Sequence, residues 1–572
     1  MSAWHGAASG LRLTIGELAR LLGRAATGAV RPLAMAEATG PASPGAVRPG
    51  ATGRRIAPRP GGSIVRLPPR PPAKLPPHLR TGGGPRALLL QGPVGPFFGK
   101  LADALEAEGL GVDRVRFNSG DRLFSSPLRP AGRRVIDYRE GRDAWAGWLR
   151  ALMMRNEYRV VVMFGGERPA HAVAREVADS LGVPVVSLEE GYFRSGYVTV
   201  EARGNNARSP VARILPPGYR ERPDDAGAAA EAGSPADATG TRETPAAEPV
   251  HEPGREPRHE PGREPAPRDP FASAPEPLEV RGGFYWMCWF GFLYFGMRNL
   301  WRRGLEKELD HKHRKSWSEV VYWWRNLGRW LADVARERLG APERRRTRLL
   351  RALDGRFDLV PLQVSDDAQL GAWSSHGWTN RRLIEAAIES FARCAPRERH
   401  LVFKIHPLER GHTRDHLLVR LFAREWGVGD RVHTIMGGPL SDATQAARGM
   451  IVINSTSGLS ALAHAKPLLV LGRAIYRHPS LARCGTGSAD IDAFWTDDFV
   501  ADRELRIAYR NWLVRRCLVP GDFYAPHAMR ATARNVARRA IALARAAAER
   551  ASRPDAGERA DIVRLPAPVR ED

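Results

Sequence analysis

A lysine and a histidine stand two positions apart where a predicted strand ends, in the segment Lys404-Ile-His-Pro407. Side chains at positions i and i+2 of a strand point to the same side, and a proline ends the strand because it has no N–H to donate. Lys404 and His406 together could therefore neutralise a leaving phosphate. A single strand histidine is often only a core residue, but the adjacent Lys404 favours a binding function.

Small polar residues follow another predicted strand, 450–454, and precede a predicted helix at 459–465. The residues concerned are Asn454, Ser455, Thr456, Ser457 and Gly458. Hydroxyl groups and backbone N–H groups at a helix N-terminus together suit a phosphate. Ordinary N-capping of the helix by Ser455 or Ser457 explains the same pattern, and the spacing alone leaves both interpretations open.

Two adjacent carboxylates, Asp366 and Asp367, follow Ser365 just beyond the predicted strand 357–363. Carboxylates paired in a cleft shift each other's pKa, so that one of them can act as a nucleophile or a base. On a solvated loop the same two residues have no catalytic role. The sequence pattern is compatible with either situation.

Polar or glycine-rich segments also end the predicted strands in the first half of the chain. They contribute Gln91, Gly92 and Gly95 after the first strand, Asn118 after the second, residues 165–168 after the third, and Glu190, Gly191 and Arg194 after the fourth. The glycines permit close approach of a ligand, although the first segment lacks a GxGxxG motif and an ordinary turn fits it equally well. Several such ends on successive strands favour a ligand site more than any one of them.

These candidate residues depend on strands and helices that alternate along the chain. Apolar runs of strand length occupy residues 87–91, 112–117, 160–164 and 184–188, and then 357–363, 400–405, 431–435, 450–454 and 467–471. Helical stretches such as 98–108 and 170–181 lie between them, and a helical tail covers about 502–547. This alternation predicts βαβ units and parallel sheets. We therefore predict a GT-B-like α/β fold, in which two Rossmann-like domains face a ligand cleft at the carboxyl ends of both sheets.

Composition divides the 572 residues further. The 57 Gly and 46 Pro exceed ordinary usage, and residues 1–84, 219–280 and 551–572 are dominated by Ala, Gly, Pro, Arg and Glu, with few large apolar side chains. We expect 1–84 to be a disordered N-terminal region, 85–218 the first Rossmann-like domain, 219–280 a disordered Pro-rich insert, 281–350 an aromatic and basic helical segment, 351–500 the second Rossmann-like domain, 501–550 C-terminal helices and 551–572 a disordered tail. The insert repeats itself at 251–257 and 259–265, and we assign no chemistry to it.

The balance of charges limits the partners. Lys and Arg number 87 against 63 Asp and Glu, a formal net charge of +24, which predicts attraction to nucleic acid, anionic lipid or an anionic substrate. Without an RRM, KH or helix-turn-helix pattern, we expect no nucleic-acid binding. Four scattered Cys exclude a disulfide scaffold, and the lack of a CxxC pair argues against zinc.

An uncharged aromatic stretch at 282–297 precedes Arg298, Arg302 and Arg303. A spanning helix needs about 20 apolar residues, so this stretch is short. Docking at a membrane interface is the favoured interpretation, because aromatic rings suit headgroup depth and arginines suit anionic lipid. A buried helix between domains and a true span are the alternatives. A second cluster of Trp, Tyr and Arg at 317–330 has the same character, and the N-terminus lacks the apolar segment of a signal peptide.

Several longer segments resemble, in order and spacing, the capsule polysaccharide biosynthesis and export proteins of the KpsS/LipB type. They are residues 88–98, 117–121, 189–194, 360–369, 401–411, 452–476 and 494–495. The resemblance covers about residues 85–520. It implies a GT-B β-Kdo transferase that is cytoplasmic and peripheral at the inner membrane. It also implies that CMP-Kdo is the donor, that an anionic phospholipid of the phosphatidylglycerol type is the acceptor, that configuration is retained, and that no metal or other cofactor is needed. Other capsule assembly and export proteins are possible partners.

The same resemblance implies roles for single residues. His406-Pro407 and the hydroxyls of residues 455–457 would bind the nucleotide phosphate, and Lys404 would offset its charge. Asp367 would be the nucleophile, with Asp366 one position away as the alternative, and Glu190 a base or an acceptor-positioning group. Arg194, Asn206 and Ser209 would contact donor or lipid phosphate. Ser195-Gly196 follows Arg194 where the family pattern has a proline, which leaves acceptor specificity open.

Two other functions stay open at this point. One is a GT-B enzyme for another nucleotide sugar, including a UDP-sugar epimerase. Another is a non-catalytic scaffold of the capsule export machinery, against which the presence of Asp367, His406 and Ser455 argues. Nucleic-acid binding rests on charge alone.

Overall fold

The computed structural model describes residues 84–125, 133–217, 219, 273–300, 321, 324, 325, 328, 332, 341–365, 370, 376–409 and 414–551. All of them belong to one unit of chain contacts, residues 69–572. Several predictions lie outside the described residues. These are Asp366 and Asp367, the repeat at 251–265, the region 1–83, most of the insert and of the 317–330 cluster, and the tail from 552.

The first sheet contains seven strands among the described residues, in the order β13-β6-β5-β4-β1-β2-β3. Their bounds are β1 Arg86–Leu89, β2 Gly111–Arg116, β3 Arg133–Asp137, β4 Tyr158–Phe164, β5 Val185–Glu190, β6 Tyr197–Ala202 and β13 Leu518–Pro520. The five strands from β5 to β3 are parallel, whereas β6 and β13 are antiparallel to their neighbours. The pairing of β13 with β6 brings the last part of the chain back to the first sheet.

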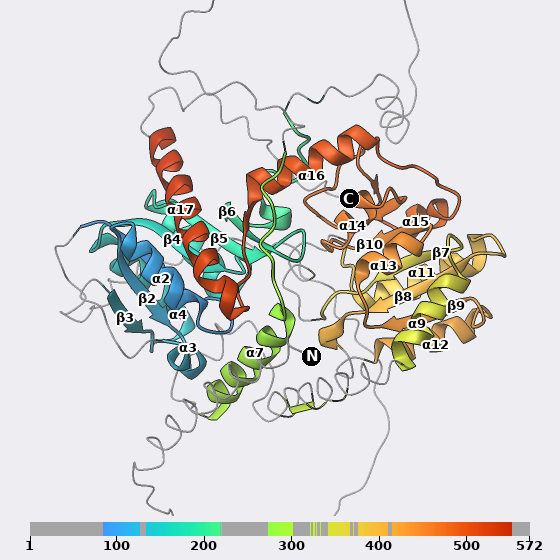
Figure 1. Ribbon diagram of the computed structural model, residues 1–572, viewed down its shortest axis with the longest axis horizontal. Helices are drawn as coiled ribbons and strands as arrows, with labels where there is room; N and C mark the ends of the chain where they lie inside the picture. Colours follow the sequence, from blue (N-terminus) through green and yellow to red (C-terminus); the bar gives the residue numbers. More distant parts are fainter. Residues whose placement is uncertain are drawn as a thin grey trace, which may run out of the picture. The chain divides into compact units, whose positions relative to one another are not determined.

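Helices cover both faces of this sheet, because alternate side chains of each strand point to opposite faces. They are α2 Phe97–Ala107, α3 Ser119–Leu123, α4 Arg142–Met154, α5 Pro169–Ser180 and α17 Pro526–Ala551. Leu89 of β1 belongs to a core with α2 and α17, whereas Leu88 belongs to a core with α4 and α5. Helices α2 and α17 pack side by side although more than 400 residues separate them (Figure 1).

The second sheet is parallel throughout its described strands, in the order β12-β11-β10-β7-β8-β9. These are β7 Phe357–Pro361, β8 His400–Ile405, β9 Val432–Met436, β10 Gly449–Val452, β11 Leu468–Val470 and β12 Arg483–Cys484. One face packs on α11 Asn380–Cys394, α12 Asp415–Glu425 and α15 Ser488–Phe494, and the other on α13 Leu440–Ala446, α14 Gly458–Ala463 and α16 Arg503–Cys517. Helix α9 Ala341–Ala352 leads into β7.

Two Rossmann-like parallel sheets confirm the predicted GT-B-like α/β fold. Each predicted strand exists, and β8 has the predicted bounds. The sequence patterns missed β3, β6, β12 and β13. Strands β12 and β13 have only two and three residues, too few for a periodic pattern to be visible.

The aromatic stretch forms helix α7, Gly283–Leu300, which packs against α3. Its side chains Phe290, Tyr294 and Phe295 are buried, whereas Phe284 and Tyr285 are 47% and 41% exposed. One side of α7 therefore matches the alternative of a buried helix, and interfacial docking through the other side stays a prediction. Within the described parts of the chain, no helix combines the length and hydropathy needed to cross a bilayer.

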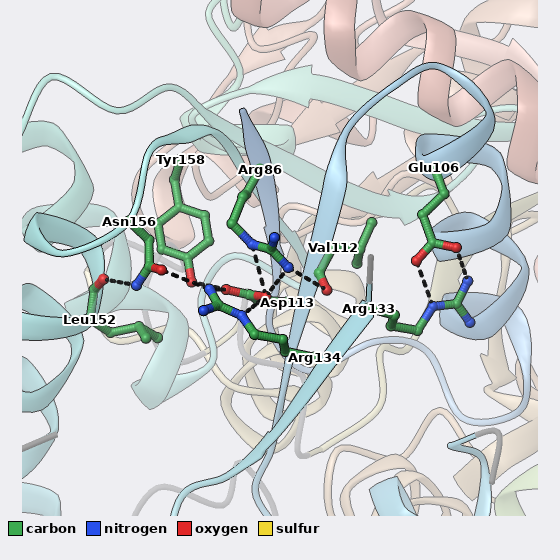
Figure 2. A network of polar contacts seen from close by, with 9 residues as sticks. All are labelled: Arg86, Glu106, Val112, Asp113, Arg133, Arg134, Leu152, Asn156 and Tyr158. Atoms are coloured by element: carbon green, nitrogen blue, oxygen red, sulfur yellow. Dashed lines mark hydrogen bonds and ion pairs between the residues drawn. The ribbon is translucent and has the colours of Figure 1, made fainter. Parts of the chain in front are cut away.

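The opposite, N-terminal ends of the first sheet's strands are joined by a buried network around Asp113 of β2 (Figure 2). The carboxylate is fully buried and accepts from Arg86 at 2.6 Å, from Arg134 and from the Tyr158 hydroxyl. Burial alone would raise the pKa of Asp113, but the hydrogen bonds from Arg134, Arg86 and Tyr158 lower it below its ordinary value. Because β1, β2, β3 and β4 each contribute one member, the network fixes the strand order at the end remote from the ligand cavity.

Candidate functional site

A cavity of about 680 Å³ is lined by residues at the carboxyl ends of strands from both sheets. The first sheet contributes Glu189, Glu190 and residues 192–195 after β5, together with Asn206. The second contributes residues 361–364 at the end of β7, 404–407 at the end of β8, 438–441 at the start of α13, and 454–464 around α14, apart from Gly458, Ala461 and Leu462. This is the location that the parallel-sheet prediction gave for a ligand site.

Lys404 and His406 lie together in the cavity wall. The Lys404 ammonium is largely buried and donates to the carbonyl oxygens of Gly437 at 2.6 Å and Gly438 at 2.9 Å. Burial, followed by the nearby charges of Arg194 and Lys404, lowers the pKa of His406 to about 4. At neutral pH the pair therefore offers one cation and one neutral imidazole, rather than two cations.

The Ser455 loop that follows β10 also lines the cavity, through Ser455, Thr456 and Ser457. Ser455 Oγ donates to Ser457 Oγ at 2.9 Å and accepts from the Ser457 N–H at 3.2 Å. Ser457 is the N-cap of α14 but makes no side-chain hydrogen bond to that helix. Ser455, by contrast, accepts from the N–H two residues further on, as a capping serine does, so the capping interpretation fits Ser455 but not Ser457. The Tyr476 hydroxyl donates to the Ser455 carbonyl, and a Cβ at Gly458 would overlap the Tyr476 ring.

Glu190 and Arg194 bring opposite charges to the first-sheet side of the cavity. Arg194 Nη2 lies 2.8 Å from Glu190 Oε2, and the Tyr524 hydroxyl donates to Glu190 Oε1 at 3.2 Å. The side chains of Arg194 and Glu190 are 63% and 26% exposed, so solvent screens their ion pair. Both remain accessible to a ligand in the cavity.

Three other predicted residues of the first domain differ in their surroundings. Asn206 lines the cavity and is buried, with its side chain bonded to the second domain. Ser209 donates to the buried Glu201 carboxylate and does not line the cavity. Gly191 does not line it either, and a Cβ there would overlap the Tyr197 carbonyl. Roles of Ser209 and Gly191 in ligand binding stay predictions.

The ends of β1 and β2 lie beneath α7 instead of at the cavity. The Tyr294 hydroxyl accepts from Gln91 Nε2 at 3.0 Å and from Asn118 Nδ2 at 2.9 Å, and it donates to Asp121 at 3.0 Å. A Cβ at Gly95 would lie 2.8 Å from the Phe290 ring, and one at Gly92 would lie 2.7 Å from the Phe98 ring. The predicted acceptor contacts Gln91, Gly92, Gly95 and Asn118 thus hold helices in place, and acceptor binding by them stays a prediction.

The segment before the predicted nucleophile reaches the cavity, with Gln363 and Val364 in its wall. Next along the chain, Ser365 donates its backbone N–H and its hydroxyl to Glu409 Oε1, at 2.9 and 3.0 Å. Asp366 and Asp367 themselves lie outside the described residues, so their catalytic role stays a prediction. Across the described ranges, no three His, Cys, Asp or Glu side chains are grouped so that they could hold a metal ion.

Sequence reasoning missed several residues of the site. Gln363 accepts from the Asn454 N–H at 3.5 Å, and its own backbone is held by Asn380. Its position at the end of the predicted strand 357–363 is a signal that could have identified it. Tyr192 lies just after β5, inside the segment 189–194, and had a similar signal. Tyr524 had none, because it reaches Glu190 only through the tertiary fold.

Two parallel sheets that share one cavity at their carboxyl ends define a protein of the GT-B type. Residues 159–216 and 312–524 match the family described as capsule polysaccharide biosynthesis protein. The chain is 31% identical over 441 residues to the capsule polysaccharide export protein KpsS of Escherichia coli, covering 77% of this chain and 97% of that one. It is 30% identical over 448 residues to the capsule polysaccharide modification protein LipB of Neisseria meningitidis serogroup A, covering 77% and 91%. The chain therefore belongs to the KpsS/LipB family of capsule polysaccharide proteins, as its motifs predicted.

Solved structures give weaker similarities. Thermosulfurimonas dismutans KpsC, a β-Kdo 2,7 transferase, matches with a TM-score of 0.28 and 11% identity, covering 72% of this chain and 89% of that one. UDP-GlcNAc 2-epimerase from Neisseria meningitidis matches with a TM-score of 0.26 and 10% identity, covering 80% and 99%. Scores this low carry no argument, and the fold assignment rests on the two sheets themselves.

Proposed function

We propose that this capsule polysaccharide biosynthesis protein is a retaining glycosyltransferase, which moves Kdo from CMP-Kdo to a phosphatidylglycerol-type lipid and so begins the capsule linker. The observation that carries the proposal is the shared cavity. There Lys404, His406 and the hydroxyls of the Ser455 loop line the second-sheet side, and Glu190 and Arg194 line the first-sheet side. The choice of Kdo, CMP and lipid rests on the sequence resemblance.

The second domain supplies the groups suited to the donor phosphate. Lys404 is a cation whose ammonium is held in place by two carbonyl oxygens, and His406 is neutral and able to donate a hydrogen bond. Ser455 and Ser457 add hydroxyl groups. Donors held in place before the reaction stabilise charge that develops on a leaving phosphate, and Lys404 does so most strongly because it is charged.

In the proposed reaction, an Asp367 oxygen forms a bond to the anomeric carbon of Kdo while the bond from that carbon to the CMP phosphate oxygen breaks. CMP leaves with the electron pair. The acceptor hydroxyl then attacks the same carbon, its proton passes to Glu190, and the Asp367 carboxylate is released. Two successive inversions retain the configuration.

A mass-spectrometric transfer assay tests this function. The full chain is incubated with CMP-Kdo generated in situ and a short-chain phosphatidylglycerol. We expect a product heavier by one or more Kdo units from the wild type and from Asp354→Ala, a control at an exposed aspartate outside the cavity. Asp367→Ala should give no such product.

Other outcomes separate the alternatives. Binding of CMP without transfer would contradict the proposed acceptor. Tighter binding of UDP than of CMP would favour an enzyme for another nucleotide sugar, including an epimerase. Neither binding nor transfer would favour the non-catalytic scaffold of the export machinery.

We also propose that α7 brings the enzyme to the anionic surface of the inner membrane, where its lipid acceptor lies. Phe284 and Tyr285 are exposed on α7, and the exposed Trp324 ring lies 5.2 Å from the Phe292 ring. Aromatic side chains of this kind bind at headgroup depth, and the basic chain favours anionic lipid. Other capsule assembly proteins would meet the enzyme there.

Co-sedimentation with vesicles tests this second proposal. We expect binding to phosphatidylglycerol vesicles that is stronger than binding to phosphatidylcholine vesicles and that Phe284→Ser with Tyr285→Ser weakens. Ile507→Ser changes a similarly exposed apolar residue on α16 and is the control. Equal binding by all variants would assign membrane contact to another part of the chain.

A further inference from the structure

A buried carboxylate on β6, Glu201, has no role in the proposed chemistry and does not line the cavity. Its side chain accepts from the Tyr192 hydroxyl at 2.6 Å, from the Ser209 hydroxyl, and from Asn205 Nδ2 at 3.3 Å. Glu201 is only 3% exposed. A carboxylate buried this deeply is costly unless it is hydrogen-bonded, so these donors are held in a defined arrangement.

Tyr192 connects Glu201 to Asn206. The same hydroxyl that donates to Glu201 accepts from the Asn206 backbone N–H. Asn206 has a φ of +50°, in the left-handed region that asparagine tolerates better than most residues. Hydrogen bonding of its N–H to Tyr192 therefore helps to fix the direction in which the Asn206 side chain points.

The Asn206 side chain joins the two domains at the Ser455 loop. Its Nδ2 donates to the Asn454 carbonyl at 3.2 Å, and its Oδ1 accepts from the Ile475 N–H at 3.0 Å. Asn454 directly precedes Ser455. Ile475 directly precedes Tyr476, whose hydroxyl donates to the Ser455 carbonyl. Both bonds from Asn206 thus reach segments that hold the same loop.

We propose that Glu201, through Tyr192, and Asn206 are positioning residues for the Ser455 loop. Glu201 orients Tyr192, Tyr192 orients Asn206, and Asn206 holds the two backbone segments that set where the hydroxyls of Ser455 and Ser457 lie. The first domain in this way determines the geometry of a phosphate-binding loop that belongs to the second. The inference rests on the proposed function only in taking that loop to bind the donor phosphate.

Two variants test the chain of contacts, and a third variant is the matched control. Asn206→Ala removes both bonds to the second domain, and Glu201→Gln disturbs the buried end without touching the cavity. Asn156→Ala removes a buried amide between α4 and β4, bonded to Arg134 and to the Leu152 carbonyl at the opposite end of the strands (Figure 2). Thermal unfolding of all three proteins reports any general loss of stability.

The first readout is hydrogen–deuterium exchange of the backbone amides at 457–459, which needs no ligand. These amides bond to Ser455 and Thr456. We expect faster exchange in Asn206→Ala and Glu201→Gln than in the wild type, and unchanged exchange in Asn156→Ala. Unchanged exchange in both test variants, or equal acceleration in Asn156→Ala, would overturn the proposal.

The second readout is the affinity for CMP and the split between KM and kcat. Loss of two hydrogen bonds predicts roughly tenfold to thirtyfold weaker CMP binding in Asn206→Ala, and a several-fold smaller effect in Glu201→Gln. The donor KM should rise more than kcat falls, whereas a lower folded fraction reduces kcat alone. Normal KM and CMP affinity in both variants would overturn the proposal. A wild type that binds no CMP would contradict the proposed function, while the exchange experiment would still decide this inference.

Discussion

The polar strand ends of the two sheets have similar sequence character but different surroundings. Gln91 and Asn118, after β1 and β2, are bonded to Tyr294 and lie beneath α7. Lys404 and His406, at the end of β8, line the cavity. A polar strand end therefore identifies the edge of a sheet where a ligand can bind, but the helix that covers it decides whether the edge stays accessible.

The largest effect on activity should come from the end of β8, which lines the cavity instead of lying beneath α7. Lys404→Ala removes the buried cation of the cavity, and we expect Kdo transfer to fall by a factor of about 100 or more, as happens when a preorganised donor to a leaving oxyanion is lost. Initial rates of product formation measure this. Lys100→Ala is the control, because Lys100 on α2 makes only a surface ion pair with Asp103 at 3.6 Å. Equal rates in both variants would show that the cavity is not the donor site.

A substitution at the ends of β1 and β2, which α7 covers, should lower the stability of the protein and leave ligand binding unchanged. Tyr294→Phe leaves Gln91, Asn118 and Asp121 without the hydroxyl that they share, so we expect the free energy of unfolding to fall by about 2 kcal/mol. Urea unfolding measures the change, and Tyr285→Phe, at a more exposed position on the same helix, is the control. CMP affinity should stay unchanged. Lost CMP affinity at unchanged stability would mean that the end of β1 belongs to the binding site.

One histidine with a lowered pKa lies at each of the two compared strand ends, His171 beside Gln91 and His406 in the cavity. Burial and the charge of Arg168 lower the pKa of His171, next to Gln91, to about 3, and burial with the charges of Arg194 and Lys404 lowers that of His406 to about 4. Both are neutral in the fold but take up a proton near pH 6.5 when unfolded. Their contribution to stability is therefore complete above about pH 6.5 and is lost as the pH falls towards 4 and 3.

NMR titration of the ring signals measures these pKa values, with His171→Gln and His406→Gln to assign them. CMP should raise the pKa of His406, because a phosphate favours the protonated ring, and should leave that of His171 unchanged. A CMP-dependent shift of His171 instead would reverse the comparison.

The smallest effect on stability should come from the exposed pair at the cavity. Arg194→Ala should change the free energy of unfolding by less than about 0.5 kcal/mol, because solvent screens its bond to Glu190. It should nevertheless raise the pKa of His406, because it removes a nearby positive charge. Arg159→Ala, which breaks a similarly exposed pair with Glu157, should leave His406 unaffected. The same NMR titration and urea unfolding measure both effects, and an unchanged His406 pKa in Arg194→Ala would contradict the prediction.

Local patterns were sufficient for most strands of the two sheets and for one wall of the site. The apolar run at 400–405 matched β8 residue for residue, and the rule that ligands bind at carboxyl ends of parallel strands located Lys404, His406 and the Ser455 loop. The covering of Asn118 could not be predicted, because its partner Tyr294 lies 176 residues away in the sequence. No periodicity encodes a contact at that separation.

Glu201 illustrates a second limit. It lies in β6, an antiparallel strand that the alternating pattern did not include. Its partners are Tyr192, from the turn between β5 and β6, and Asn205 and Ser209, from the segment that follows β6. The sequence identified Asn206 and Ser209 as polar candidates without separating them. Only the fold shows that Asn206 reaches the second domain whereas Ser209 supports Glu201.

The return of the chain to the first sheet has a consequence for synthesis on the ribosome. Helix α17 covers the same sheet face as α2, and its residues Met529, Val536 and Ala540 complete the core that begins with Leu89 and Phe97. While the ribosome is still translating the second domain, the part of that apolar face that α17 covers has no partner. The second domain can therefore finish folding before the first, although it is made later, and a chaperone has its greatest opportunity to bind the first domain during this interval. Proteolysis of nascent chains stalled before and after α17 would measure the order directly, and protection of the first domain before α17 emerges would refute it.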